Sequence, residues 1–236
     1  SLFGRGVEYA GTFAGGRKKV EAGFVGQSFS LTDRSPFFKN GFGAYVRTTS
    51  GADNASKNWS ASYIFREDPF ERVRHSLLGV EGSYDFARSW KIYTKAFGGY
   101  SDQQESGGTP SLALETQYSG LIKKLSLSGN YYYSSRYYPG NRRGMVQLQQ
   151  SASLPFSGKH SVYANILYAD FAPKFYGLTF APKTANTRLD AGINWARWGN
   201  VTLGTGYQYQ SDASNTYNAY LGNPFGTEVR GVSAHR

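Results

Sequence analysis

Hydrophobic and polar side chains alternate strictly over stretches of about ten residues along most of this chain. The clearest stretch is 125–136, where Leu125, Leu127 and Tyr131 fall on one side and mostly serine and asparagine fall on the other. Successive side chains of a β-strand point to opposite faces. The pattern therefore predicts strands that each have one apolar face and one polar face.

The same alternation predicts about twelve strands, joined as an antiparallel up-and-down meander. Short turns are expected after the first, fifth, seventh, ninth and eleventh strands. Longer polar connections are expected at 102–110, 137–144, 172–186 and from 211 onward, and the segment 51–58 is longer than this scheme predicts. The predicted strands are 7–13, 20–24, 38–48, 59–66, 78–84, 90–96, 112–118, 125–136, 146–154, 162–168, 189–195 and 201–210.

The length and number of these alternating stretches favour a membrane-spanning barrel over a soluble sandwich. A tilted strand needs about 9–11 residues to cross the hydrocarbon layer, and half of its side chains can be polar. No stretch approaches the roughly 18–20 consecutive apolar residues of a transmembrane helix. We expect an all-β, antiparallel up-and-down transmembrane β-barrel that forms a single domain over residues 1–236. A soluble β-sandwich is the alternative, and it predicts a protein that stays in solution without detergent.

The polar face carries charged residues at the middle of several strands. An Arg or Lys facing lipid at the bilayer midplane costs about 2–4 kcal/mol, so these side chains are expected to face a lumen. There they pair across strands or line an aqueous path with a weakly positive field, which gives mild anion preference. The lumen-lining candidates are Lys39, Arg47, Arg66, Glu81, Lys91, Lys95, Glu115, Arg136, Arg188 and Asp190.

Aromatic side chains gather toward the ends of the predicted strands, where the two membrane interfaces would lie. Tyr and Trp favour this depth because the ring is apolar while its OH or NH stays hydrated. The predicted interfacial girdle consists of Tyr84, Trp90, Tyr133, Tyr168, Trp195, Tyr207 and Tyr209.

Composition adds few candidates for chemistry. The chain has no cysteine, its net charge is +10 with pI near 9.6, and its three histidines have no spacing suited to metal ligation. We expect no cofactor and no metal site. The positive charge suits anionic partners such as lipid head groups, polysaccharide or nucleic acid, and basic loops facing lipopolysaccharide explain it without nucleic acid. His75, near Glu67 and Asp68, is the best candidate if the protein is a membrane-embedded hydrolase.

Two of the predicted loops stand out. The segment 137–143 combines tyrosines with two arginines, which suits sugar stacking or lipopolysaccharide phosphates. A second loop contains the tetrapeptide Phe-Ala-Pro-Lys twice, at 171–174 and 180–183. Proline stiffens both arms, so this loop is expected either to fold inward as a constriction or to form an external binding surface.

Through its alternating strands, aromatic girdles and asymmetric loops, the whole chain resembles bacterial outer-membrane β-barrel proteins of the porin, secretion or usher type. The resemblance implies residence in a Gram-negative outer membrane, contact with lipid and lipopolysaccharide, and insertion by the barrel assembly machinery. It also implies a pore or translocation channel for solutes, including anions or polysaccharide, or for exported polymer. The alternative is a structural or adhesive barrel with a filled lumen, whose loops bind polysaccharide or a partner protein. The first predicted strand runs downward and no aromatic residue ends the chain, so we expect the barrel to continue beyond both ends.

Overall fold

The computed structural model describes residues 3–28, 41–51, 57–68, 71–86, 89–103, 107–140, 142–157, 160–176, 181–198, 201–217 and 227–235. Within these ranges no helix is long and apolar enough to cross a membrane. The strands are β1 (Phe3–Phe13), β2 (Lys18–Ser28), β3 (Phe42–Ser50), β4 (Lys57–Asp68), β5 (Val73–Phe86), β6 (Trp90–Gln103), β7 (Gly107–Ile122), β8 (Leu125–Ser134), β9 (Met145–Ser157), β10 (His160–Phe171), β11 (Lys183–Trp198), β12 (Val201–Tyr217) and β13 (Thr227–His235).

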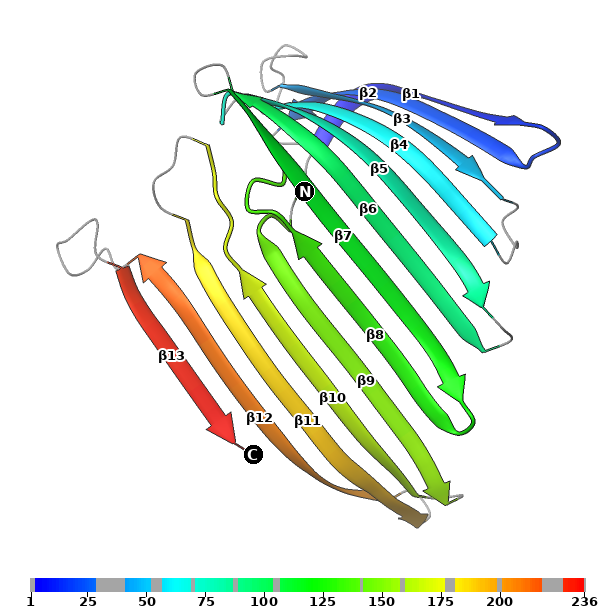
Figure 1. Cartoon of the computed structure of the whole chain (residues 1–236), viewed down its shortest axis with the longest axis vertical. Helices are drawn as coiled ribbons and strands as arrows, with labels where there is room; N and C mark the ends of the chain where they lie inside the picture. Colours follow the sequence, from blue (N-terminus) through cyan, green and yellow to red (C-terminus); the bar gives the residue numbers. More distant parts are fainter. Residues whose placement is uncertain are drawn as a thin grey trace.

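The thirteen strands of the described residues belong to one sheet, and each pairs antiparallel with its neighbours in the sequence (Figure 1). This confirms the all-β, up-and-down antiparallel meander. In the described residues the edge strands β1 and β13 do not pair with each other, so the sheet is open. Closure into a barrel is therefore not part of this structure.

Four details of the predicted layout are wrong. The connection expected at 172–186 ends earlier, because β11 begins at Lys183. The stretch after Ser211 was expected to be loop, but β12 continues to Tyr217 and β13 follows. The long connection expected after the sixth strand is short, because β6 and β7 pair as far as Gln103 and Gly107. Strand β8 ends at Ser134, so Arg136 lies in a turn and not on a strand.

The register divides the sheet into two faces. One row runs Tyr9–Ala22–Val46–Tyr63–Leu78 across five strands, and we call its side the apolar face. The neighbouring side chains along each strand form the polar face, with rows such as Ser60–Glu81–Lys95–Glu115. The predicted alternation of the two faces is therefore confirmed by the strand pairing.

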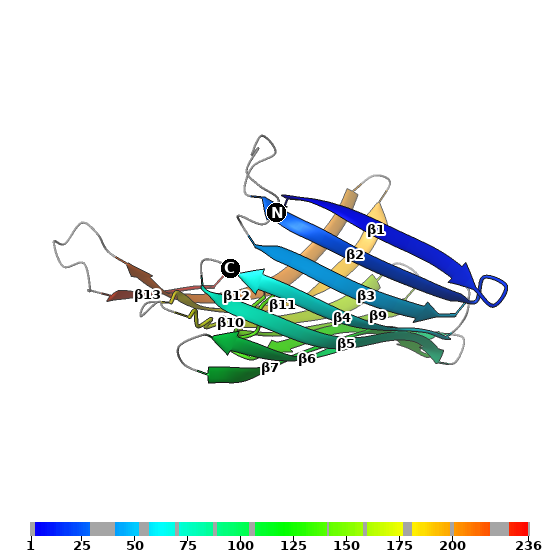
Figure 2. The ribbon, with the colours of Figure 1, turned by 90° about the horizontal axis from the view of Figure 1, so that it is seen from above.

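The sheet curves toward its polar face. Glu71 precedes β5 and Tyr176 follows β10, and these two ends would lie roughly 24 Å apart on a flat sheet with about 4.8 Å between strands. In the structure the Tyr176 N–H donates to the Glu71 carboxylate at 2.9 Å. The view from above shows the bend, with β1 and β2 rising above the middle strands (Figure 2).

Burial is inverted relative to a soluble protein. The large hydrophobic side chains with 37–77% of their surface exposed lie almost entirely on the apolar face, from Val7 on β1 to Tyr207 on β12. The buried core lies on the polar face, near one end of the middle strands. It contains Val73, Leu77, Ala113, Tyr132, Tyr138 and Tyr176 together with His75 and Ser101.

Glycines on the apolar face make room for aromatic rings from the adjacent strand. A Cβ on Gly120 would lie 2.2 Å from the Trp90 ring, and one on Gly129 would lie 2.5 Å from the Tyr118 ring. The two rings stack with centroids 6.0 Å apart. Aromatic side chains therefore lie flat along this face.

Candidate functional site

A row of alternating charges crosses the polar face, and we call it the charge ladder. It consists of Arg47, Glu81, Lys95, Glu115 and Arg142. Glu81 on β5 is paired with Arg47 of β3, and its other oxygen lies 3.6 Å from Lys95 Nζ on β6. The Ser60 and Tyr93 hydroxyls also donate to Glu81, at 2.8 and 2.9 Å. One carboxylate thus binds side chains from three other strands, which holds these charges against the sheet.

The ladder continues through Glu115, which lies directly opposite Lys95 in the register. Its carboxylate is 3.4 Å from Arg142 Nη1, and Arg142 Nη2 donates to the Gln147 side-chain oxygen at 2.7 Å. The Arg142 guanidinium also lies 3.8 Å from the centroid of the Tyr132 ring. Arg142 comes from the β8–β9 connection, so this connection folds back over the polar face.

Most of the predicted lumen-lining residues lie on the polar face. Arg188 and Asp190 form an ion pair at 3.0 Å on β11, and Arg66 pairs with Asp68 at 3.3 Å on β4. Arg136 is exposed in the turn after β8, and Lys39 lies outside the described residues. The polar-face members are Arg47, Arg66, Glu81, Lys91, Lys95, Glu115, Arg188 and Asp190.

The predicted girdle residues lie on the apolar face, but only five of them are near strand ends. Tyr84, Trp90, Tyr133, Tyr168 and Trp195 fall within four residues of the end of their strands. Tyr207 and Tyr209 lie in the middle of β12 because that strand is 17 residues long.

Two connections fold together over one end of the polar face. We call residues 135–140, 142–144 and 172–176 the inner cap. The Ala172 N–H donates to the Gly144 carbonyl at 2.8 Å, and the Lys174 N–H donates to the Arg136 carbonyl at 2.8 Å. Pro173, in the first Phe-Ala-Pro-Lys copy, is buried. The described part of that loop therefore folds inward, while residues 177–180 lie outside the described ranges.

An ion pair fastens the inner cap to the β4–β5 turn. Arg143 Nη1 lies 2.9 Å from Glu71, and only 9% and 12% of the two side chains are exposed. Arg143 also donates to the carbonyls of Tyr138 and Lys174, at 2.9 and 3.1 Å. With the Tyr176 N–H as a further donor, Glu71 joins three separate connections.

Tyr138 anchors the cap to the sheet. Its ring is 9% exposed and packs with Leu77 and Ala113, against which Ile64 and Phe97 also pack. Burial raises the pKa of Tyr138 to about 12, so the phenol stays neutral at ordinary pH. A cavity of about 200 Å³ lies between the cap and the charge ladder, bounded by Lys95, Glu115 and Arg142 among others.

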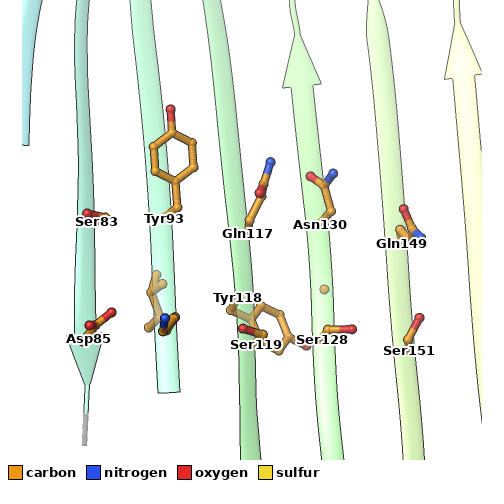
Figure 3. Close-up of a pocket in the computed structure, with 13 residues that line it drawn as sticks. Ser83, Asp85, Tyr93, Gln117, Tyr118, Ser119, Ser128, Asn130, Gln149 and Ser151 are labelled. Atoms are coloured by element: carbon orange, nitrogen blue, oxygen red, sulfur yellow. The ribbon is translucent and has the colours of Figure 1, made fainter. Parts of the chain in front are cut away.

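Below the charge ladder the polar face forms an open groove of about 550 Å³. Its side chains lie at two levels, with Tyr93, Gln117, Asn130 and Gln149 above Ser119, Ser128 and Ser151 (Figure 3). The charged residues that line it are Asp85 and Lys91, which face each other in the register.

The structure brings His75 next to Ser101, a residue that sequence reasoning did not single out. His75 Nδ1 lies 2.8 Å from Ser101 Oγ, and the two residues are 1% and 0% exposed beneath the inner cap. Asp68 lies at the end of the neighbouring strand, paired with Arg66. Among the described residues no cluster of three His, Asp or Glu side chains is arranged to hold a metal ion.

Sequence reasoning missed Glu71 and Tyr176 of this site. Glu71 lies 72 residues from Arg143 and 105 from Tyr176 in the sequence, and no local sequence pattern predicts contacts over such separations. The arginines at 142 and 143 stood out, but they were expected to face a sugar or phosphate. They instead bind Glu115 and Glu71 of the same chain.

Comparison with protein-family models, curated proteins and solved structures gave no match to this chain.

Proposed function

We propose that this chain forms the wall of a transmembrane β-barrel of a bacterial outer membrane, with a channel for solutes or exported polymer on its polar face. The observation that carries the proposal is the inverted arrangement of the sheet: exposed hydrophobic side chains on the convex apolar face and charges on the concave polar face. Soluble monomers rarely expose apolar patches above a few hundred Å². A face that spans β1 to β12 needs an apolar solvent, and lipid supplies it.

The length of the strands and the hydrogen bonding of a polar side chain on the apolar face both support contact with lipid. Each strand has at least nine residues, which is enough to cross the hydrocarbon layer when tilted. Gln150 interrupts the apolar row of β9, but its side-chain oxygen accepts hydrogen bonds from the hydroxyls of Tyr118 and Tyr131. In hydrocarbon an unpaired polar group costs several kcal/mol, so this internal pairing is what the membrane requires.

The proposal also requires both sheet edges to be paired in the membrane. Hydrocarbon offers no hydrogen-bond partner to the free backbone groups of β1 and β13. A closed cylinder with the polar face inside satisfies them and places the charge ladder around an aqueous lumen.

Conductance of the purified chain in planar lipid bilayers tests the channel. We expect discrete ion-conducting steps, because the groove below the inner cap is open and lined by polar side chains. A protein that stays monomeric in solution without detergent would refute membrane insertion.

A filled structural or adhesive barrel is the second candidate, and the inner cap favours it. The cap packs hydrophobic side chains into one end of the polar face and fastens them with the Glu71–Arg143 pair. Absence of conductance in the intact chain and also after deletion of residues 137–143 would favour the filled barrel over the channel.

A further inference from the structure

We propose that the groove on β6–β9 binds a neutral, hydroxyl-rich chain, namely an uncharged oligosaccharide. A role of this binding in transport rests on the proposed function, because only in a channel does the groove lie on a transport path. Binding itself is a separate property of the groove and is measured without conductance.

The groove presents hydrogen-bonding groups in a regular array. Gln117, Asn130 and Gln149 lie opposite one another on β7, β8 and β9. Two residues away along each strand, Ser119, Ser128 and Ser151 form a second row in the same register. Neighbours within a row are about 4.8 Å apart across strands, and the two rows are about 6.8 Å apart along them. A ligand lying in the groove can therefore contact several amides and hydroxyls together.

The chemistry of these side chains matches sugar hydroxyls. Carboxamides and hydroxyls both donate and accept hydrogen bonds, as a sugar hydroxyl does. Gln117 donates its Nε2 to Glu115 at 2.9 Å, which fixes the amide and leaves its oxygen on the groove side. Asn130 Oδ1 is buried and has no hydrogen-bond partner among the described residues. A turn of the Asn130 amide toward the groove that it lines would bring this acceptor to a ligand hydroxyl.

The charge balance argues against an ionic ligand. Asp85 and Lys91 face each other at the edge of the groove and compensate. One row above, Glu81 is paired with Arg47 and Lys95, and Glu115 is paired with Arg142. The amide and serine rows themselves carry no charge. The mild anion preference expected from the excess of basic residues therefore has no counterpart in this groove.

Tyr93, opposite Gln117 in the register, borders the groove with an aromatic ring. Its hydroxyl donates to Glu81 at 2.9 Å, which holds the ring upright at the level of Gln117 (Figure 3). The apolar face of a sugar ring packs well on an aromatic ring that is already held in place, since little side-chain entropy is lost. Amide, hydroxyl and aromatic groups together select a saccharide over a peptide or an ion.

Isothermal titration calorimetry of the detergent-solubilised chain with maltohexaose and cellohexaose tests the proposal. At least one of these hexasaccharides should bind. The triple variant Gln117→Leu/Asn130→Leu/Gln149→Leu should weaken binding by at least about tenfold, since it removes three side chains that hydrogen-bond the sugar. The matched control is Gln208→Leu, on the same face of β12 but outside the groove, and it should leave affinity unchanged. The single variant Asn130→Asp, which keeps the shape of the side chain, should weaken binding by desolvation of its charge.

Several outcomes overturn the inference. They are absence of binding to both hexasaccharides, equal affinity in the groove variants and the control, or tighter binding of a sulfated oligosaccharide than of either neutral one. Conductance of the same preparation is recorded separately. A conducting protein that fails to bind sugar refutes the inference and leaves the channel standing. Sugar binding without conductance, both in the intact chain and after deletion of residues 137–143, refutes the channel alone.

Discussion

Removal of the Glu71 carboxylate should release the inner cap. In Glu71→Ala, Arg143 loses its buried counter-charge and the Tyr176 N–H loses its acceptor. Hydrogen bonds to charged groups contribute about 1.5–3 kcal/mol, and breaking a buried pair costs about 3–5 kcal/mol. We therefore expect the free energy of local cap opening to fall by about 3–5 kcal/mol.

Native-state hydrogen exchange of the folded protein in detergent or lipid measures this opening. The reporting amides are those of Gly144 and Ala172, which donate within the cap to Ser135 and Gly144 at 3.0 and 2.8 Å. A loss of 3 kcal/mol corresponds to more than a hundredfold faster exchange when exchange follows the open population. If the cap narrows a channel, single-channel conductance should also increase.

A matched control separates the effect of breaking the buried ion pair from the effect of removing an exposed carboxylate on the same face. Arg188 and Asp190 form an exposed ion pair on the same face, with side chains 47% and 27% exposed. Exposed pairs contribute at most about 1 kcal/mol, so Asp190→Ala should leave cap exchange unchanged. The double variant Glu71→Leu/Arg143→Met should recover part of the loss, because no lone buried charge remains. Unchanged exchange in Glu71→Ala, or equal acceleration in Asp190→Ala, would refute this account of the cap.

Three further predictions concern the two faces of the sheet. Glu81→Gln leaves Arg47 and Lys95 without their carboxylate, so the reversal potential under a salt gradient should shift toward anion selectivity. An unchanged or cation-shifted potential would contradict the proposal that the charge ladder lines a channel. Gln150→Ala removes the shared acceptor of two tyrosines and should lower the free energy of unfolding in lipid vesicles by about 1–3 kcal/mol, measured by urea titration; no loss would contradict the pairing. Val80→Arg places a charge on the apolar face and should lower the free energy of unfolding in the same assay by about 2–4 kcal/mol. Its control, Ser83→Arg on the polar face, should lower it by less than about 1 kcal/mol. Equal losses in the two variants would contradict the assignment of the faces.

Period-two alternation made the faces and the strand order predictable, because strand pairing preserves the side on which each residue lies. Strand ends were less predictable, since β6 and β7 extend by pairing with each other through residues that are polar and glycine-rich. Strand β13 was missed because the sequence alternates weakly there: Glu228, Arg230 and Val232 follow one another at every second position.

The inner cap could not be predicted from local patterns. Its central ion pair joins residues 72 positions apart, and the curvature of the whole sheet brings them together. The loop 137–143 shows how one composition supports two interpretations. Aromatics beside arginines suit an external saccharide, but in the folded chain Arg142 and Arg143 find carboxylates on the sheet and on a neighbouring turn.

The central claim is that the exposed hydrophobic face contacts acyl chains while the charged face borders water. The chain has no cysteine, so single cysteines can be introduced and labelled one at a time. In vesicles, cysteines at Val80 and Ile166 should react with a lipid-confined thiol probe, and cysteines at Arg47 and Lys95 should react only with a water-soluble one. Labelling of positions 47 and 95 from the lipid, with positions 80 and 166 protected, would contradict the account.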